Sequence, residues 1–350
     1  MIRSISPAAT REIASCVQVI LDKCKNCIGN SITHNTVFRN AIICKSKLLL
    51  IDESVSTDQF NDSEIIEQLI NTSSFGYVYY VRYNNKRVVV KISDILNVVN
   101  NILIDKSQYN YPENYLLDEF INECDQIIKY GSLISYFPNN IIKIFNTCTS
   151  FVENNIFPVN IIYMEHITGN IMSNYITNMP DDNANEVISL IRQLLAILLY
   201  CNLCGYYHND VNLHNILVQK CNLTDVVINF NDVFQNSDIS HNSFITIQNV
   251  SNIPVLVDYS FSKFIDKKIL FPIECVMLLS VIKINTKCIT LLSWMNKIDN
   301  ILSQLLDKYN IYSTNFINKI LSGNGIFDIN DYNDLPSISN DDVLLIINNI

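Results

Sequence analysis

Short apolar runs of the kind that form β-strands are concentrated in the first half of the chain. Each run is rich in β-branched or aromatic residues and is bounded by polar residues. The runs cover residues 69–70, 77–81, 87–92, 141–145 and 159–164. Asn84 and Asn85 separate the second run from the third and favour a hairpin turn, because asparagine tolerates a positive φ. The pattern predicts a small β-sheet.

Helical spacing of apolar residues dominates the rest of the chain. It is found in residues 8–28, 113–130, 184–204, 273–283, 288–308, 313–322 and 340–349. An Asn-rich insert, residues 219–252, interrupts the helical part and holds two short apolar bursts, which predict a hairpin or loop. A further strand-like run at 41–51 precedes a polar boundary. We therefore expect an α+β fold with an N-terminal extension (1–57), a sheet unit with one helix (58–165) and a mainly helical unit (166–350).

Composition fits two folded units and argues against one class of partner. The chain has 350 residues, of which 49% are hydrophobic, enough for a sizeable core and too many for a disordered chain. The net charge is −10 and the pI is near 4.9. A nucleic-acid partner is not expected, because phosphate backbones are bound by clustered Lys and Arg. Any phosphate bound here must be held locally, by a few cations, backbone amides or a metal.

Export and membrane signals are weak in this sequence. The segment Leu194–Leu199 is the most apolar stretch and falls short of the roughly 18–20 apolar residues of a membrane span. The first seven residues lack the long apolar segment of a signal peptide. We therefore expect a cytoplasmic protein whose eleven cysteines are reduced. The pair Cys201/Cys204 has zinc-ligand spacing, but its position on an amphipathic run favours core thiols.

The segment 207–218 gives the strongest indication of chemistry. Asp210 lies five residues before Asn215, and an apolar run follows. A carboxylate in such a loop can orient a hydroxyl group and accept its proton. An amide oxygen can bind a hard cation such as Mg²⁺, which takes oxygen ligands. One turn rarely needs both side chains for structure alone, which favours a functional role for the pair.

A second carboxylate and a cation are available elsewhere in the chain. Asp258 ends the apolar run 254–257, and Lys91 ends the run 88–90. Two acidic groups with an amide between them form an incomplete metal–phosphate site, and a lysine supplies the missing positive charge. We expect these side chains to converge. Taken alone, Lys91 would be interpreted as a surface lysine at the end of a strand.

The order of these motifs resembles that of the eukaryotic-type protein kinases across residues 69–283. The matching segments are 71–78 (glycine-rich loop), 88–91 (phosphate-pairing lysine), 120–123 (helix with its glutamate partner), 137–143 (entry to the next strand), 161–169 (hinge), 208–215 (catalytic loop), 258–260 (metal-binding Asp-Phe-Gly) and, faintly, 271–274 (Ala-Pro-Glu). Ordered motifs are far more specific than any one of them. The resemblance implies a bilobal α+β fold, with a small antiparallel sheet lobe and a mainly helical lobe. The Asn- and Ile-rich composition also resembles kinases of large DNA viruses.

The resemblance also implies ATP and Mg²⁺ as cofactors, a protein substrate and transfer of the γ-phosphate to serine or threonine. Lys91 would hold the phosphates and Glu123 would steady it. Asn215 and Asp258 would bind the metal, and Asp210 would orient the acceptor hydroxyl. The residues implied in nucleotide binding are Asn71, Ser73, Ser74, Phe75, Gly76, Val78, Lys91, Met164, Glu165 and Ile167.

Several positions depart from the kinase pattern. Asn71 and Ser73 replace two glycines, which puts nucleotide affinity in question because Ser73 brings a Cβ close to the phosphates. Asn209 replaces an arginine that recognises activation-loop phosphate, so switching by such phosphorylation is not expected. Asn212 replaces a lysine that touches the transferred phosphate, which could lower the rate or change the acceptor. Ser260 replaces the last glycine of Asp-Phe-Gly.

Two other functions stay open from the sequence. A small-molecule kinase of the aminoglycoside or choline type also resembles the chain at 208–210 and in the missing lysine. A pseudokinase acting as a binding module is favoured by the lost glycines and opposed by the retained polar residues. Individual assignments have rivals too, since Glu119 could partner the lysine in place of Glu123, Met164 could be plain core and His208 is expected to be structural.

Overall fold

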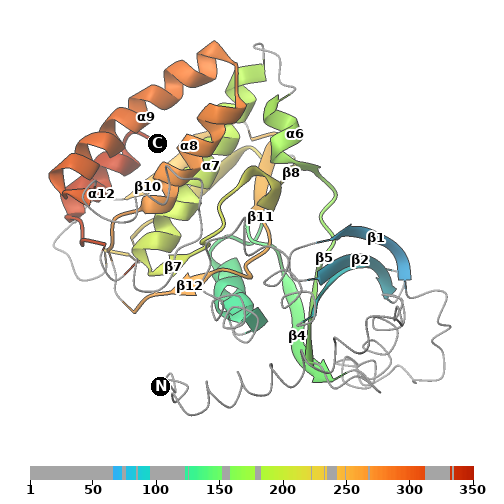
Figure 1. The fold of residues 1–350 in the computed structure, drawn as a ribbon. Coiled ribbons are helices and arrows are strands. Elements are labelled where there is room, and N and C mark those ends of the chain that lie inside the picture. The colour runs from blue at the N-terminus through green and yellow to red at the C-terminus, as the bar shows by residue number, and fades with distance from the viewer. Residues whose placement is uncertain are drawn as a thin grey trace, which may run out of the picture. The chain divides into compact units, whose positions relative to one another are not determined.

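The computed structural model describes residues 66–72, 76–83, 86–94, 123–124, 126–151, 158–177, 183–221, 223–231, 233–234, 243–248, 250–266, 269–311, 332 and 335–350. Contacts divide the chain into two units, residues 1–59 with 151–156 and residues 60–150 with 157–350. The elements described below, which Figure 1 draws as ribbons, belong to the second unit except for Phe151. The predicted extension 1–57, with its helix and strand, lies outside the described residues, and the predicted domain boundaries stay predictions.

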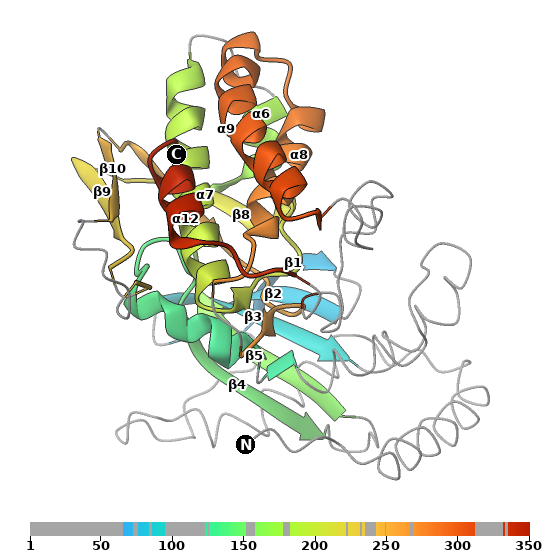
Figure 2. The same ribbon diagram turned by 90° about the vertical axis from the view of Figure 1, so that its left-hand side faces the viewer.

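A five-stranded sheet forms from the β-rich runs (Figure 2). Its order is β1 (Ile66–Thr72), β2 (Gly76–Tyr83), β3 (Lys86–Asp94), β5 (Pro158–Glu165) and β4 (Ile144–Phe151). The pairs β1–β2, β2–β3 and β3–β5 are antiparallel. Tyr83 pairs with Lys86, so a two-residue link joins β2 to β3 and the predicted hairpin is confirmed. Its two asparagines lie outside the described residues.

The strand predicted over residues 141–145 was wrong in its position. β4 begins only at Ile144, and Ile141 forms an isolated parallel bridge with Leu256. Ile141 and Ile142 are both buried, and the Ile142 N–H donates to the Leu256 carbonyl at 3.3 Å. Their apolar character therefore serves packing against the segment around residue 256. A short apolar run does not distinguish this role from that of a strand.

The helical part is built around α7 (Ala184–Leu203), which is almost wholly buried. By length and composition α7 could span a membrane, but 78% of its apolar window is buried within the fold, so it is a core helix. It ends before Gly205, whose φ of 83° is left-handed, as expected for a glycine after a helix. Cys201 is buried on this helix, in agreement with a core thiol.

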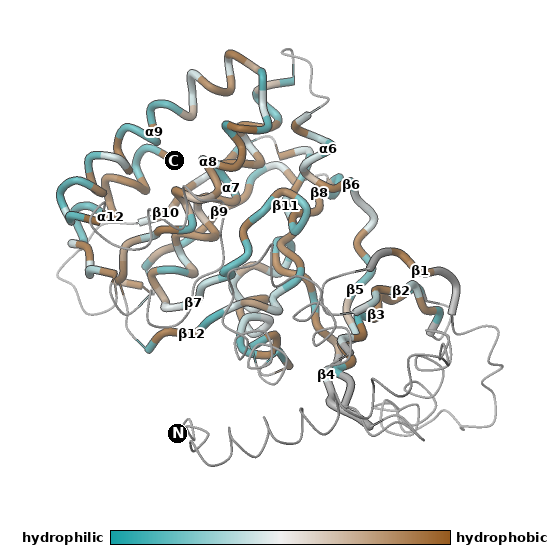
Figure 3. The backbone as a smooth tube through the Cα atoms, in the orientation of Figure 1, coloured by the Kyte–Doolittle hydropathy of each residue, from teal (hydrophilic) through white to brown (hydrophobic). Residues whose placement is uncertain are grey.

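Three further helices confirm the predicted periodicity. They are α8 (Ile273–Asn285), α9 (Ile289–Lys308) and α12 (Asn340–Ile347). α7 contacts α8 and α9, and α12 contacts α9. Along α9 apolar and polar stretches alternate (Figure 3), because one face of the helix is buried. The helix predicted over 313–322 lies outside the described residues, and of the helix predicted over 113–130 residues 123–124 and 126–130 are described and helical.

Among the described residues, three short antiparallel sheets flank the polar loops of the helical part. β8 (Ile216–Lys220) lies between β11 (Asn252–Leu256) and β6 (Asn170–Ile171), next to which α6 (Met172–Thr177) begins. β7 (Tyr206–Tyr207) pairs with β12 (Lys263–Phe264). In the Asn-rich insert β9 (Asp225–Asn229) pairs with β10 (Phe244–Gln248), which confirms a hairpin there. The described fold is mixed, with several antiparallel sheets, and is compatible with the bilobal arrangement.

A buried glutamate ties α8 to the loop that follows β7. Glu274 is fully buried in the first turn of α8. Its carboxylate accepts hydrogen bonds from the Asn209 N–H at 2.6 Å and from the Asn202 side-chain amide at 2.7 Å. Asn209 in turn bonds to the Phe261 carbonyl at 3.1 Å and accepts from the Tyr332 hydroxyl at 2.8 Å. This network fixes the loop against the segment after Asp258.

Removing this carboxylate is expected to destabilise the fold. Glu274→Ala leaves two buried donors without acceptors, at a cost of about 1–3 kcal/mol each, measured by urea unfolding at neutral pH. Burial raises the pKa of Glu274 above its usual value of 4.5. The folded state therefore binds the Glu274 proton more tightly than the unfolded state does. The stability that protonation of Glu274 contributes is lost as pH rises from 4.5 through the folded pKa. Asp299→Ala, which breaks a surface pair with Lys283, is the control and costs at most about 1 kcal/mol.

Candidate active site

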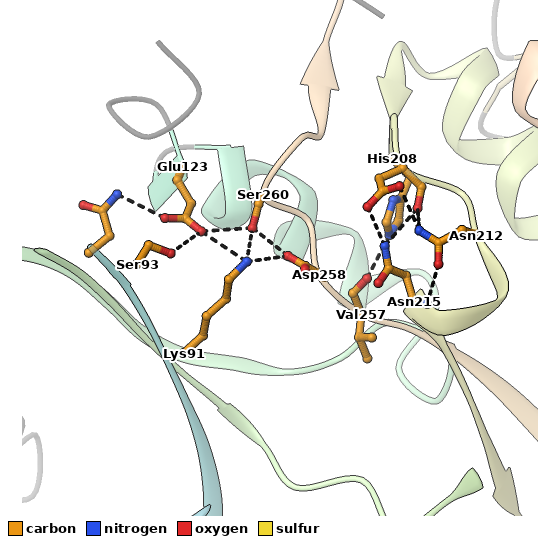
Figure 4. A network of polar contacts seen from close by, with 11 residues as sticks. Lys91, Ser93, Glu123, His208, Asn212, Asn215, Val257, Asp258 and Ser260 are labelled. Carbon is orange, nitrogen blue, oxygen red and sulfur yellow. Dashed lines mark hydrogen bonds and ion pairs between the residues drawn. The ribbon is translucent and has the colours of Figure 1, made fainter. Parts of the chain in front are cut away.

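Lys91 lies between two carboxylates from distant parts of the chain. It belongs to β3 and is 3% exposed. Its Nζ is 2.6 Å from Oδ1 of Asp258 and 3.3 Å from Oε1 of Glu123 (Figure 4). It also donates to the hydroxyl of Ser260. The structure therefore joins three predicted site residues through one ammonium group.

Glu123 is anchored to the sheet by neutral donors as well. The Ser93 hydroxyl donates to Oε1 at 2.9 Å, and the Asn160 amide donates to Oε2 at 3.1 Å. Ser93 and Asn160 are register partners on β3 and β5, so the sheet holds both donors side by side. A third contact comes from Ser260 at 2.9 Å. Glu123 thus partners Lys91, while the rival Glu119 lies outside the described residues.

One face of the five-stranded sheet brings together Lys91 and two of the residues implied in nucleotide binding. Val78 pairs with Lys91, and Lys91 pairs with Ile162, so their side chains share a face. Met164, two residues after Ile162, lies on the same face. Gly76 begins β2, and a Cβ there would lie 1.8 Å from the Ile92 carbonyl oxygen, so this close approach requires glycine.

The Asp210 carboxylate is held by two asparagine amides. Asn212 Nδ2 donates to Oδ1 at 2.8 Å, and Asn215 Nδ2 donates to Oδ2 at 2.7 Å. The Asn212 side-chain oxygen also accepts from the N–H groups of His214 and Asn215, which caps the short 3-10 helix η4 (Leu213–Asn215). Both carboxylate oxygens are therefore fixed in direction, although no cation lies among these partners.

Asp258 follows β11 and lies next to the Asp210 loop. The Val257 N–H donates to the Asn215 carbonyl at 3.0 Å, and His208 Nε2 donates to the Val257 carbonyl at 3.0 Å. His208 is buried, in keeping with a structural role. Asp258 has a φ of 61°, a left-handed conformation that is uncommon for a residue other than glycine. Backbone contacts thus place the two carboxylates on adjoining segments.

The two aspartates differ in their affinity for protons. Burial, together with the charge of Asp258, raises the pKa of Asp210 above its usual value. Burial alone would also raise the pKa of Asp258, but Lys91 outweighs it and lowers that pKa. For Lys91 burial is outweighed by Asp258 and Glu123, which raise its pKa. A carboxylate suited to accepting a proton therefore lies beside one that stays ionised.

The remaining residues implied in nucleotide binding make no contact with Lys91 that the described residues show. Asn71 belongs to β1 and pairs with Val78 through the backbone, whereas Ser73, Ser74 and Phe75 lie outside the described residues. Glu165 ends β5, and its N–H donates to the Lys143 carbonyl at 2.9 Å. Glu165 and Ile167 both line a pocket of about 260 Å³. The lining of that pocket includes none of the charged groups around Lys91, so it is separate from them.

The sequence indicated two of the site's polar residues only as departures from the kinase pattern. Asn212 and Ser260 were noted because they replace a lysine and a glycine, yet each makes hydrogen bonds to a predicted site residue. For Asn212 a signal was available, since a side chain two residues from a carboxylate in a turn is within reach of it. The same holds for the contact of Ser260 with Asp258, two residues before it, whereas its contacts with Glu123 and Lys91 cross 137 and 169 residues and leave no local signal.

Comparison with known proteins gives limited support for the kinase resemblance. No family model matches the chain. A protein named as a probable protein kinase in Dictyostelium discoideum is 24% identical over 178 residues, which are 50% of this chain. The chain spans only 15% of that relative's length. The match does not test the resemblance to viral kinases, which stays a prediction. What it suggests is a distant relationship to protein kinases over half of this chain.

Proposed function

We propose that this chain is a protein kinase that transfers the γ-phosphate of Mg-ATP to serine or threonine hydroxyls. The observation that supports it most is the placement of Lys91 Nζ, 2.6 Å from Asp258 and 3.3 Å from Glu123. The Asp258 segment is bonded in turn to Asn215 of the Asp210 loop. A lysine, two acids and a second loop of polar groups are what a metal–phosphate site needs.

The free oxygen atoms at the site suit a hard cation. Asn215 uses its Nδ2 to bond Asp210, and within the described residues its Oδ1 accepts no hydrogen bond. Oδ2 of Asp258 is likewise without a partner there, and this side chain is 31% exposed. The described residues hold no cluster of three or more His, Cys, Asp or Glu that could enclose a metal. The oxygen atoms of Asn215 and Asp258 fit Mg²⁺, which is typically held by one or two protein ligands together with phosphate oxygens and water.

Each residue has a distinct task in this proposal. ATP would supply the phosphoryl group, and Mg²⁺ would neutralise part of the phosphate charge. Lys91 binds phosphate oxygens, and Glu123 keeps its ammonium group in place. Asp210, fixed by Asn212 and Asn215, orients the acceptor hydroxyl and takes its proton. Its raised pKa suits this step, because a base works best when its proton affinity is not too low.

A phosphotransfer assay tests this function. The chain is incubated with ATP labelled in the γ-phosphate, with and without Mg²⁺, and with either a mixture of protein substrates or a set of small alcohols. We expect Mg²⁺-dependent label on serine or threonine of protein. Label only on small alcohols would replace the proposal with a small-molecule kinase, and nucleotide binding without transfer would replace it with a pseudokinase.

Binding of Mg-ATP is also expected to stabilise the fold. At a ligand concentration 100 times Kd the gain in the free energy of unfolding is about 2.7 kcal/mol, measured as a shift in thermal unfolding. ATP in the presence of a chelator is the matched control and should give a smaller shift, because Asn215 and Asp258 then have no metal to bind. An equal shift with and without metal would contradict the assignment of these two residues.

A further inference from the structure

The hydroxyl group of Ser260 contacts three charged groups of the site, Lys91, Glu123 and Asp258 (Figure 4). Lys91 donates to its Oγ, which lies 2.6 Å from Oδ1 of Asp258 and 2.9 Å from Oε1 of Glu123. The residue is 2% exposed, so water does not compete for these contacts. A glycine at this position would leave all three contacts unmade.

The donor and acceptor capacity of a hydroxyl determines how these contacts combine. A serine hydroxyl has one hydrogen and two lone pairs. Lys91 occupies a lone pair, and the single hydrogen goes to Asp258 or to Glu123. The carboxylate that does not receive it is still paired with Lys91. The hydroxyl can therefore exchange its hydrogen between the acids while the lysine stays between them.

The backbone around Ser260 is fixed by its neighbours. The ring of Tyr259 stacks on Tyr130 at 4.5 Å between centroids, and its hydroxyl accepts from the Ile142 N–H at 3.0 Å. The Gln126 side chain, with its amide nitrogen turned to this loop, donates to the carbonyls of Ser260 and Ser262 at 2.8 and 3.1 Å. Gln126 lies one turn after Glu123, so the helix and the loop are tied together beside the charged groups.

We propose that Ser260 is a positioning residue, whose hydroxyl holds the ammonium group of Lys91 between Glu123 and Asp258. The inference rests on the proposed function and deepens it. If Asp258 engaged a metal, Glu123 and the serine hydroxyl would still hold the ammonium group of Lys91. At the third position of this Asp-Tyr-Ser segment, a serine with a fixed hydrogen-bonding hydroxyl thus stands in place of a conformationally flexible glycine.

Ser260→Ala is expected to lower kcat/KM for Mg-ATP by about 10-fold or more, as for a lost hydrogen bond to a charged group. Ser260→Thr, which keeps a hydroxyl, should restore kcat/KM. Ser262→Ala removes a buried serine from the same loop that bonds only weakly, at 3.4 Å to the Gln126 carbonyl, and should leave kcat/KM unchanged.

A second readout needs neither nucleotide nor catalysis. The rate at which an amine-acylating reagent modifies Lys91, followed by peptide mass spectrometry on the folded protein, should rise several-fold in Ser260→Ala and stay at the wild-type rate in Ser260→Thr. Wild-type kinetics together with a wild-type acylation rate in Ser260→Ala would overturn the positioning role. If the wild-type chain transfers no phosphate, the proposed function falls, and the acylation rates alone decide whether Ser260 holds Lys91.

Discussion

Asp210→Asn is expected to lower the rate of phosphate transfer by about 10²–10⁴-fold, the usual contribution of a positioned acid–base group. The carboxylate is held from both sides, at 2.8 Å by Asn212 and at 2.7 Å by Asn215. Burial raises its pKa and so favours acceptance of a proton. An amide of the same shape cannot accept the proton of the acceptor hydroxyl, so phosphate transfer should slow although the shape of the site is kept.

Binding of Mg-ATP should survive the same change, which separates catalysis from affinity. Lys91 and Asp258, assigned to the phosphates and the metal, do not bond to Asp210. Asn215 bonds to Asp210 through its Nδ2 at 2.7 Å, whereas the atom assigned to the metal is its Oδ1. Steady-state rates and the thermal shift with Mg-ATP are measured on both proteins, with Asp225→Asn at an exposed position of β9 as a charge-matched control. Full activity in the Asp210 variant would remove this residue from the proposed mechanism.

Lys91→Met is expected to lower the free energy of unfolding by about 3 kcal/mol and to abolish stabilisation by Mg-ATP. Glu123 is 2% exposed, and without the lysine its charge is buried with neutral partners only. Breaking a buried ion pair by removing one partner typically costs 3–5 kcal/mol. The hydrogen bonds from Ser93 and Asn160 offset part of this cost and favour the lower end of the range.

A double-mutant cycle tests the physical reason. Adding Glu123→Gln to Lys91→Met should recover part of the lost stability, because the uncompensated charge disappears with it. Lys143→Met replaces an exposed lysine and should change stability by no more than about 0.5 kcal/mol. Strictly additive losses in the cycle would mean that Lys91 and Glu123 do not interact across the 3.3 Å that separates them.

The sequence predicts which segments form helices and strands better than where they end or what they contact. Lys91 was expected at the end of a strand, but β3 continues to Asp94, and only the order of motifs pairs Lys91 and Asp258 with Glu123. That order rests on resemblance, since no local pattern relates residues 167 positions apart. The structure places all three within one set of hydrogen bonds, as the resemblance implies.

The misjudged features have a common physical cause. Ile141 and Ile142 form an apolar run like that of a strand, but tertiary packing against Leu256 determines their conformation. Ser260 was noted only as a replacement of a glycine, and only the folded backbone shows that its hydroxyl contacts Lys91 and Glu123. Local patterns encode propensity and periodicity, whereas these contacts depend on how the chain returns on itself.

A crystal structure of the chain with Mg²⁺ and a non-hydrolysable ATP analogue tests the central claim most directly. The account predicts one nucleotide whose phosphates contact Lys91 and whose metal is bound by Oδ1 of Asn215 and the carboxylate of Asp258, with Asp210 facing the terminal phosphate. A nucleotide bound elsewhere, or a metal held without Asn215 and Asp258, would contradict it.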